Sequence, residues 1–346
     1  MKIKSLQFGK AMSAALFVLL LSVAGMKNAL AQTQVATLQH NDTISAYYGM
    51  NALVEAHAAA VDGDVITLSS GTFTKTNITK AITLHGAGCT TDTLGITPTF
   101  VAGDFNIEVL NTTSFLTIEG ICFQGTIVYK RQLYHAKFIK CNFSSILNNG
   151  FSGVEGGGLR DVQFIDCLIG NIRVASSTNS VSIINCAIGS LRSLTNGGTS
   201  FNVYNSVIKI AKSDTNYNSN QMYLYNCIVG STIAGSTLAE SSAYNCIVIG
   251  TVFSSSVQTF NCMSVDSYSE VFESFDGTFS FDADYSLKEE IATSFLGNDG
   301  REVGIYGGAM PYNPRPSYLI LNRCNVANRS TIDGKLSVDI EVITSE

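Results

Sequence analysis

The 346-residue sequence is poor in charge. Only 14% of its residues are Asp, Glu, Lys or Arg, and it contains no Trp, whereas soluble domains typically carry ~25% charged residues. The formal net charge of −6 excludes the basic surface that a general nucleic-acid binder needs. Gly, Ser, Thr and Asn are abundant instead. This composition suits an all-β repeat protein that is held together by backbone hydrogen bonds and stacked side chains.

The sequence also lacks any long apolar run beyond its N-terminal region. That region contains three lysines within the first ten residues, an apolar stretch at 14–25 that is too short to span a bilayer comfortably, and an Ala-x-Ala cleavage site ending at Ala31. We therefore expect residues 1–31 to be a signal peptide. The mature chain should be secreted, periplasmic or located on the cell surface, with no integral membrane segment after cleavage.

A helical apolar period is absent between the strand-like segments, which excludes leucine-rich and helical repeats. The segments IINCAIGS, LYNCIVGS and AYNCIVIG show what replaces it: short stretches of period two on either side of a recurring Asn-Cys pair. Successive equivalents from Cys141 to Cys262 are 26, 19, 20, 21, 19 and 16 residues apart. A period near 20 residues predicts an all-β solenoid, a parallel β-helix with three sheets and about ten coils.

The Asn-Cys pair has a structural explanation. Asn tolerates left-handed backbone angles, so we expect a column of corner asparagines at Asn185, Asn205, Asn226, Asn245 and Asn261. The next residue should point inward as a small apolar side chain, which gives a second column at Cys141, Cys167, Cys186, Cys227, Cys246 and Cys262.

Neighbouring coils lie ~4.8 Å apart, so the thiols of this column should be neighbours. Ser206 and Ile121 take the same place in their coils, which favours packing over bonding. The total of nine cysteines is odd. Disulfides between some coils stay open as an alternative, as does a metal or catalytic Cys site.

The early part of the chain resembles a known family. Residues 63–68 (GDVITL), 71–73 (GTF) and 82–88 (ITLHGAG) are similar to the first coils of right-handed parallel β-helix proteins of the pectin-lyase-like superfamily. Residues 51–61 resemble the short helix that plugs the open end of such solenoids. The resemblance covers about residues 50–290 and implies a right-handed coil with an N-terminal capping helix.

The repeat fades after Cys262. Residues 304–311 (GIYGGAMP) and the alternating residues 335–344 resemble the ends of uncharacterised exported proteins of Bacteroidetes type. We expect a signal peptide at 1–31, an N-terminal segment at 32–50, the capped β-helix at 51–300, and a proline-containing link with a C-terminal strand tail at 301–346. The tail could cover the last coil or dock on a partner.

A basic row is predicted on one sheet. Arg173, Arg192 and Lys212 each follow the inward corner position by six residues, and each comes after an apolar residue. They should therefore point outward from successive coils. Like charges this close repel one another, and an acidic polysaccharide would relieve the repulsion. The alternative is that the side chains extend into water and pair with nearby acidic residues.

An aromatic row is predicted on another sheet. Tyr204, Tyr225, Tyr244 and Phe260 lie two residues before the inward corner position and should face outward. Sugar rings stack on exposed aromatic faces. Aromatic side chains of neighbouring coils also stack on one another and stiffen a sheet. The sequence leaves both interpretations open.

The sequence identifies no catalytic residues. No Asp recurs at a fixed coil position to build a Ca²⁺ cage, and the histidines at 40, 57, 85 and 135 are too scattered to suggest a metal site. The resemblance implies a Trp-containing Asp-His motif and an Arg-x-Pro-x-x-Arg motif in pectate-lyase-like enzymes, and both are absent. We expect no metal and no cofactor, with Ca²⁺ relevant only if the chain is a lyase.

The leading expectation is an exported, monomeric, non-catalytic protein that contacts glycans or surfaces in the manner of an adhesin. Its partner would be an acidic polysaccharide or a host glycan rather than nucleic acid. One alternative is a polysaccharide lyase or glycoside hydrolase that acts on an acidic polysaccharide. Another alternative is a structural module that engages a partner through the C-terminal strand.

Overall fold

The protein is described from a computed structural model. It describes residues 34–90, 97–110, 112–148, 157–174, 178–193, 199–210, 220–231, 241–250, 253, 257–280, 283–313, 319–326 and 338–344. The predicted signal peptide, residues 1–31, lies outside these ranges. Within them, no helix combines the length and the apolar character needed to cross a membrane.

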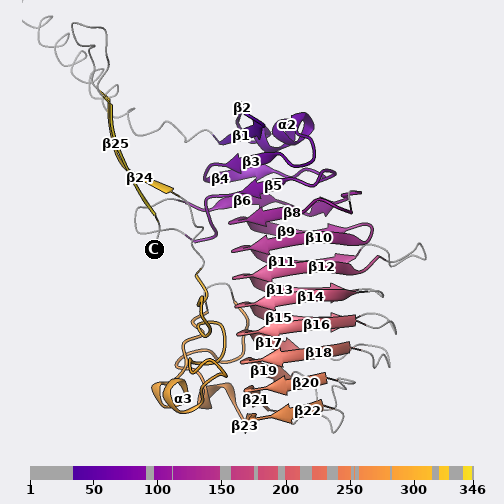
Figure 1. Cartoon of the computed structure of the whole chain (residues 1–346), viewed down its shortest axis with the longest axis vertical. Helices are drawn as coiled ribbons and strands as arrows, with labels where there is room; N and C mark the ends of the chain where they lie inside the picture. Colours follow the sequence, from indigo (N-terminus) through magenta and orange to yellow (C-terminus); the bar gives the residue numbers. More distant parts are fainter. Residues whose placement is uncertain are drawn as a thin grey trace, which may run out of the picture. The chain divides into compact units, whose positions relative to one another are not determined.

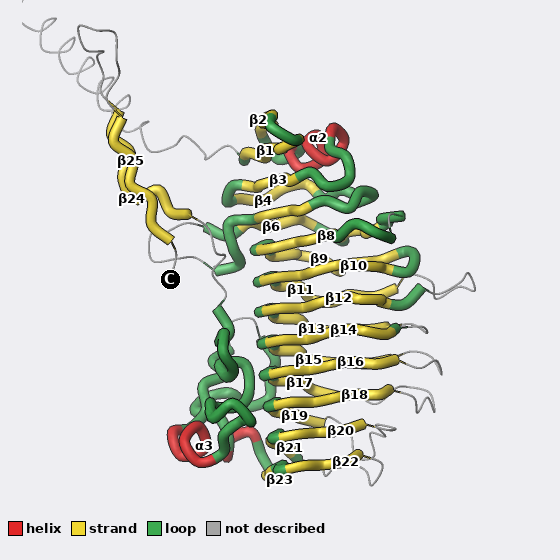
Figure 2. Tube along the Cα trace, in the orientation of Figure 1, coloured by secondary structure: helices red, strands yellow, loops and turns green. Residues whose placement is uncertain are grey.

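The described chain is an all-β parallel solenoid, with about 51% strand and 8% helix (Figure 2). Most of its strands form two long sheets. Sheet A has twelve strands in the order β2 (Thr43–Tyr48), β1 (Val35–His40), β3 (Val65–Leu68), β5 (Thr83–His85), β8 (Leu116–Glu119), β10 (Leu133–Ile139), β12 (Leu159–Ile165), β14 (Asn179–Ile184), β16 (Thr199–Tyr204), β18 (Asn220–Tyr225), β20 (Ser241–Tyr244) and β22 (Val257–Phe260).

Sheet B has eleven strands. Its main order is β4 (Gly71–Thr74), β6 (Thr99–Ala102), β9 (Cys122–Tyr129), β11 (Asn142–Asn148), β13 (Leu168–Val174), β15 (Ala187–Ser193), β17 (Val207–Ile210), β19 (Ile228–Ser231), β21 (Ile247–Ile249) and β23 (Met263–Val265), and β7 (Phe105–Ile107) also pairs with β9.

Each coil contributes one strand to sheet A and, after a sharp corner, one strand to sheet B (Figure 1). From β3 to β22 the sheet A strands are parallel, each pairing with the strand of the next coil. The strand order contains ten such coils, and about seven turns form the regular solenoid. The predicted parallel β-helix is confirmed.

The hydrogen-bonded strands form two sheets where the sequence predicted three. The difference arises because the long strands bend instead of ending. In sheet A, His135, Asp161 and Ser180 have φ of 49°, 50° and 54° and bend their strands. In sheet B, the strand β13 bends at Gly170, where an added Cβ would lie 2.3 Å from the Ser144 carbonyl oxygen.

The N-terminal end of the solenoid is closed by two elements. The helix α2 (Ala52–Ala59) buries Leu53 and Ala56 in the main core, as predicted for the end plug at 51–61. The hairpin β1–β2 extends sheet A, with β1 antiparallel to β3. The sequence analysis assigned residues 32–50 only as an N-terminal segment and missed this hairpin.

The outer face of sheet B is covered by residues 268–313, which we call the cover. The repeat stops at Val265, and the cover contains the 3₁₀ helix η2 (Tyr268–Glu270) and the helix α3 (Glu289–Ser294). Its apolar residues Phe272 and Ile305 form a second core with the first residues of successive sheet B strands. Those strand residues are Leu168, Ala187, Val207, Ile228 and Ile247. The β-helix was predicted to extend to residue 300, but the chain leaves the coil about 35 residues earlier by the strand bounds.

The last two strands form a separate antiparallel pair, β24 (Leu319–Val326) with β25 (Val338–Thr344). The strand predicted from the alternation at 335–344 corresponds to β25.

The cover should loosen when its central aromatic side chain is truncated. Phe272 is buried and packs edge-to-face on Phe275 with ring centroids 5.1 Å apart, and a buried Phe→Ala change costs about 3–5 kcal/mol. We expect Phe272→Ala to make limited proteolysis within the cover at least about tenfold faster. Leu296→Ala, at a position that is 39% exposed, is the matched control. Equal cleavage rates in the two variants would contradict the second core.

Candidate functional site

The corner column has the backbone conformation expected of it. The corner asparagines have φ of 50° (Asn185), 44° (Asn205), 54° (Asn226), 50° (Asn245) and 49° (Asn261). In three earlier coils the corner residues are Gly120, Lys140 and Asp166, with φ of 66°, 52° and 52°. From Gly120 to Asn245, each corner amide donates to a carbonyl of the next coil, as in Asn185 N to Tyr204 O at 3.1 Å. The corners therefore stack in register, one per coil.

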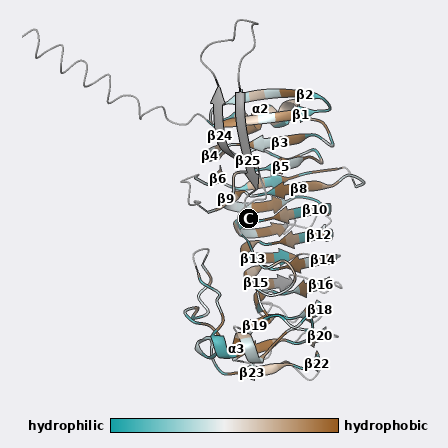
Figure 3. Cartoon of the chain, turned by 60° about the vertical axis from the view of Figure 1, so that its left-hand side comes forward, coloured by the Kyte–Doolittle hydropathy of each residue, from teal (hydrophilic) through white to brown (hydrophobic). Residues whose placement is uncertain are grey.

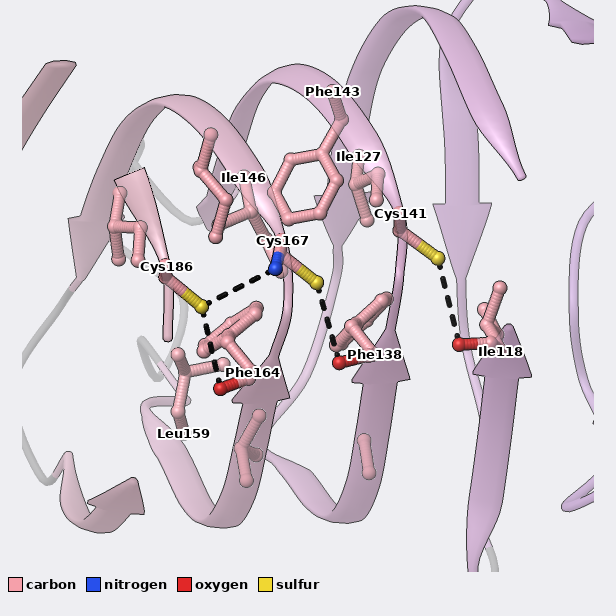
Figure 4. Close-up of a cluster of buried hydrophobic side chains, with 14 of the residues drawn as sticks. Ile118, Ile127, Phe138, Cys141, Phe143, Ile146, Leu159, Phe164, Cys167 and Cys186 are labelled. Carbon is pink, nitrogen blue, oxygen red and sulfur yellow. Dashed lines mark hydrogen bonds between the residues drawn. The ribbon is translucent and has the colours of Figure 1, made fainter. Parts of the chain in front are cut away.

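The thiols next to the corners form the inward column (Figure 4). Cys141, Cys167 and Cys186 are fully buried. Each thiol lies against a carbonyl oxygen of the preceding coil: 3.4 Å from Ile118 O for Cys141, 3.3 Å from Phe138 O for Cys167, and 3.4 Å from Phe164 O for Cys186. Cys227 and Cys262 repeat this contact further along.

This column also has a hydrogen-bonding role, which the sequence pattern did not predict. The buried amide of Cys167 donates to Cys186 Sγ at 3.4 Å, and the amide of Cys186 donates to Ser206 Oγ at 3.0 Å. A buried N–H without an acceptor is costly, so the coils of Cys167 and Cys186 each need a small acceptor in the next coil. Both a thiol and a hydroxyl meet this need, which explains why Ser206 can replace Cys.

Eight cysteines, at positions 89, 122, 141, 167, 186, 227, 246 and 262, are free thiols. Burial raises the pKa of the Cys141 and Cys167 thiols well above the usual value, so these thiols are poor nucleophiles. In the described residues, no group of three or more His, Cys, Asp or Glu side chains could hold a metal ion.

The hydrogen-bonding role predicts how Cys186 tolerates substitution. Cys186→Ala removes the acceptor of the Cys167 amide and should lower the free energy of unfolding by about 1–3 kcal/mol. Cys186→Ser keeps an acceptor and should cost less than the Ala change, since Ser206 already serves in this way. Chemical denaturation of the two variants measures the difference. Equal losses would show that the column acts by packing alone.

The cover also contacts the corner column directly. Asn226 Nδ2 donates to Asn298 Oδ1 at 3.0 Å, and the amide of Gly304 donates to Asn226 O at 2.8 Å. Further along, Asn185 Nδ2 donates to the carbonyl of Met310. The later part of the cover therefore follows the corners toward earlier coils. Beyond it, Asn261 donates to Asn245 Oδ1 at 2.6 Å, so the corner asparagines also bond to one another.

Asp166 is a charged substitute in this column. Its side chain is only 9% exposed, and burial raises the pKa of its carboxyl to about 6, although Lys140 and Asn185 act in the opposite direction. The folded state therefore holds this proton more tightly than the unfolded chain does. By linkage, the carboxyl reduces stability as the pH rises from about 4 to about 6.

Asp166→Asn should consequently stabilise the fold near neutral pH. We expect a gain of about 1–3 kcal/mol at pH 7.5 that shrinks toward zero at about pH 3, because the carboxyl is then mostly protonated in both states. Urea unfolding at the two pH values tests this expectation. A constant difference between the variants, or a loss of stability at pH 7.5, would contradict the assignment.

The predicted aromatic row is a continuous stack. Ring centroids are 5.1 Å apart for Tyr204–Tyr225, 5.0 Å for Tyr225–Tyr244 and 4.6 Å for Tyr244–Phe260, with interplanar angles of 10°, 4° and 5°. The rings thus use their faces for one another and turn their edges outward. Burial and the neighbouring tyrosines raise the pKa of Tyr225.

A polar row lies beside the aromatic row on the same face of sheet A. Its members occupy the previous outward position of each strand: Gln163, Ser182, Asn202, Tyr223, Ser242 and Gln258. None carries a formal charge. The residues between the two rows, such as Val203 and Leu224, are fully buried. Hydropathy accordingly changes from residue to residue along the strands (Figure 3).

The structure brings together two members of the predicted basic row. Arg173 and Arg192 are direct register partners in β13 and β15, and Arg173 is half-buried next to the buried Ile172. The register shifts between β15 and β17, where Leu191 pairs with Ile210. Counting six residues from the corner therefore does not identify the next member of the row. Lys212 lies outside the described residues.

Three histidines pair with carboxylates of neighbouring chain segments, which the sequence analysis did not foresee. His40 Nδ1 lies 2.8 Å from Asp64 Oδ1, His85 Nδ1 lies 3.1 Å from Glu119 Oε2, and His135 Nδ1 lies 2.6 Å from Asp161 Oδ2. Glu119 and Asp161 are the carboxylates within the strands of sheet A, and the strand sequences of sheet B contain none.

The chain was compared with protein families, curated proteins and solved structures. No family model matches it, and no curated protein or solved structure matches at a significant level. The class that the structure defines is the parallel β-solenoid.

Proposed function

We propose that the protein is an exported, non-catalytic solenoid that binds a linear glycan along the outer face of sheet A between β12 and β22. The observation that carries this proposal is the register of the polar row over six consecutive sheet A strands and of the aromatic row over the last four of them. The resemblance of residues 63–88 to pectin-lyase-like proteins, which work on polysaccharides along such coils, supports the same class of ligand.

The register favours a polymer over a compact ligand. Each row offers a similar group once per coil, about every 4.8 Å. Only a ligand that repeats its own groups can use several coils at once, and a polysaccharide chain presents hydroxyls in this way. Each hydrogen bond contributes only about 0.5–1.5 kcal/mol, so useful affinity comes from engaging several coils together.

The chemistry of the two rows fits sugars. Amide, hydroxyl and phenol groups both donate and accept hydrogen bonds, as sugar hydroxyls do. The stacked rings hold the phenols of Tyr204, Tyr225 and Tyr244 at fixed intervals, because each ring is fixed by its neighbours at about 5 Å. The aromatic row therefore acts as a rigid support for phenol groups rather than as a set of open ring faces.

The covered state of sheet B favours sheet A as the binding face. The cover packs on the first residues of five sheet B strands, whereas the described residues place no segment on the polar row. The alternative is a lyase or hydrolase that acts on an acidic polysaccharide, for which the register of Arg173 with Arg192 on sheet B is the supporting observation.

The proposal predicts that phenol hydroxyls contribute to binding. Tyr204→Phe, Tyr225→Phe and Tyr244→Phe together remove three hydroxyls and keep the ring stack. Because each lost hydrogen bond costs about 0.5–1.5 kcal/mol of binding free energy, we expect the affinity for a bound glycan to fall about tenfold or more. The Tm should change little, since the ring stack is kept. Affinity electrophoresis in gels that contain neutral or acidic polysaccharides measures the change.

Tyr47→Phe, on β2 and away from the rows, is the matched control. Retention of the triple variant equal to that of the parent in every gel would contradict the proposal. Release of unsaturated sugars, seen as ultraviolet absorbance, would show that the lyase alternative is correct.

A further inference from the structure

Two cysteines outside the inward column lie together near the start of the solenoid. Cys89 follows β5, and Cys122 is the first residue of β9. The amide of Gly88 donates to the carbonyl of Gly120 at 2.9 Å, so the two chain segments run beside each other one coil apart. This backbone spacing, about 4.8 Å between neighbouring strands, falls within the 4.4–6.8 Å that a disulfide needs between its Cα atoms.

The two side chains are near each other. The Cys89 and Cys122 thiols lie close enough for each to shift the pKa of the other. The Cys89 thiol also lies 3.6 Å from the carbonyl oxygen of Lys140, at the corner of the coil after Cys122. The Cys89 side chain is therefore directed toward the later coils, where Cys122 lies.

This pair differs from the inward column in exposure. Cys89 and Cys122 are both half-buried, whereas Cys141, Cys167, Cys186, Cys227 and Cys246 are buried. These five thiols are enclosed in the core, where solvent-borne reagents cannot reach them, whereas Cys262, in the last coil of the column, is half-buried. The pair at Cys89 and Cys122 lies where such reagents can reach it.

The two thiols of the pair also differ from each other in pKa. The side-chain interaction with Cys89 lowers the pKa of the Cys122 thiol, although burial acts in the opposite direction. Burial and the same interaction raise the pKa of Cys89. Cys122 is therefore the better nucleophile, and Cys89 is placed as the second, resolving thiol.

We propose that Cys89 and Cys122 are a reactive dithiol that forms an inter-coil disulfide when the exported chain meets a small-molecule disulfide such as oxidised glutathione. The Cys122 thiolate attacks one sulfur of the oxidant and releases one glutathione thiolate, which leaves a mixed disulfide on Cys122. Cys89 then loses its proton and attacks Cys122 Sγ, which releases the second glutathione. Two protein thiols are oxidised and one oxidised glutathione is reduced to two thiols.

The bond would tie the early coils together. It would close a loop from residue 89 to residue 122 that contains β6, β7 and β8. Closing a loop of this length restricts the unfolded chain. The disulfide would thus stabilise the end of the solenoid that lies next to the capping helix.

The test uses the full chain, purified under reductant and then incubated with oxidised glutathione. Free thiols are alkylated, and non-reduced peptides are mapped by mass spectrometry. We expect one linked species that joins the Cys89 and Cys122 peptides, with the five buried thiols of the inward column alkylated only after denaturation. The oxidised form should melt about 3–8 °C above the reduced form.

Cys122→Ser should abolish both the linked species and the rise in Tm, while its reduced form melts like the reduced parent. Cys186→Ser, which alters the inward column, is the matched control and should keep the link. The proposal is overturned if Cys89 and Cys122 stay fully alkylatable after oxidation. It is equally overturned if Cys122 accumulates only as the glutathione adduct, or if the link joins other cysteines.

Discussion

The corner hydrogen bond between coils is the constraint on which the rest of the structure depends. A left-handed residue turns the chain from sheet A into sheet B, and the amide that follows points into the core. For Cys167 and Cys186, that amide is satisfied by the thiol or hydroxyl of the next coil. A corner that slipped by one residue would lose this acceptor and would turn an inward side chain outward. The corners therefore fix the register, and the register aligns every other row of side chains.

The consequences of this register differ between the two sheets. On sheet B, the aligned first strand residues form an apolar strip, which the cover buries. On sheet A, the aligned outward residues form the polar row and the aromatic stack. The same coil geometry thus produces one face that the chain uses for its own stability and one face that we assign to a glycan. A solenoid can divide its faces in this way because each strand alternates between the core and the outside.

Much of the coil could be predicted from the sequence because its signals are local and repeated. The Asn-Cys pairs reveal the corners, and the alternation around them reveals the strands. The cover could not be predicted in this way, because its contacts with Asn185 and Asn226 join residues that are 125 and 72 positions apart and follow no period. The two bent sheets were missed because His135 and Asp161 take left-handed angles inside strands. Of the predicted basic row, Arg173 and Arg192 are register partners in neighbouring strands, but the register shift after β15 is invisible to a count of residues.

The most direct test of the account is the distance across the polar row. Lys137, Gln163, Ser182, Asn202, Tyr223, Ser242 and Gln258 are successive register partners. Spin labels on genetically encoded ketone side chains at positions 137 and 258, which avoid the native thiols, can be measured by double electron–electron resonance. Six steps of about 4.8 Å predict a single peak near 29 Å. Several peaks, or one peak far from this value, would show that the coils do not stack in the register on which the account rests.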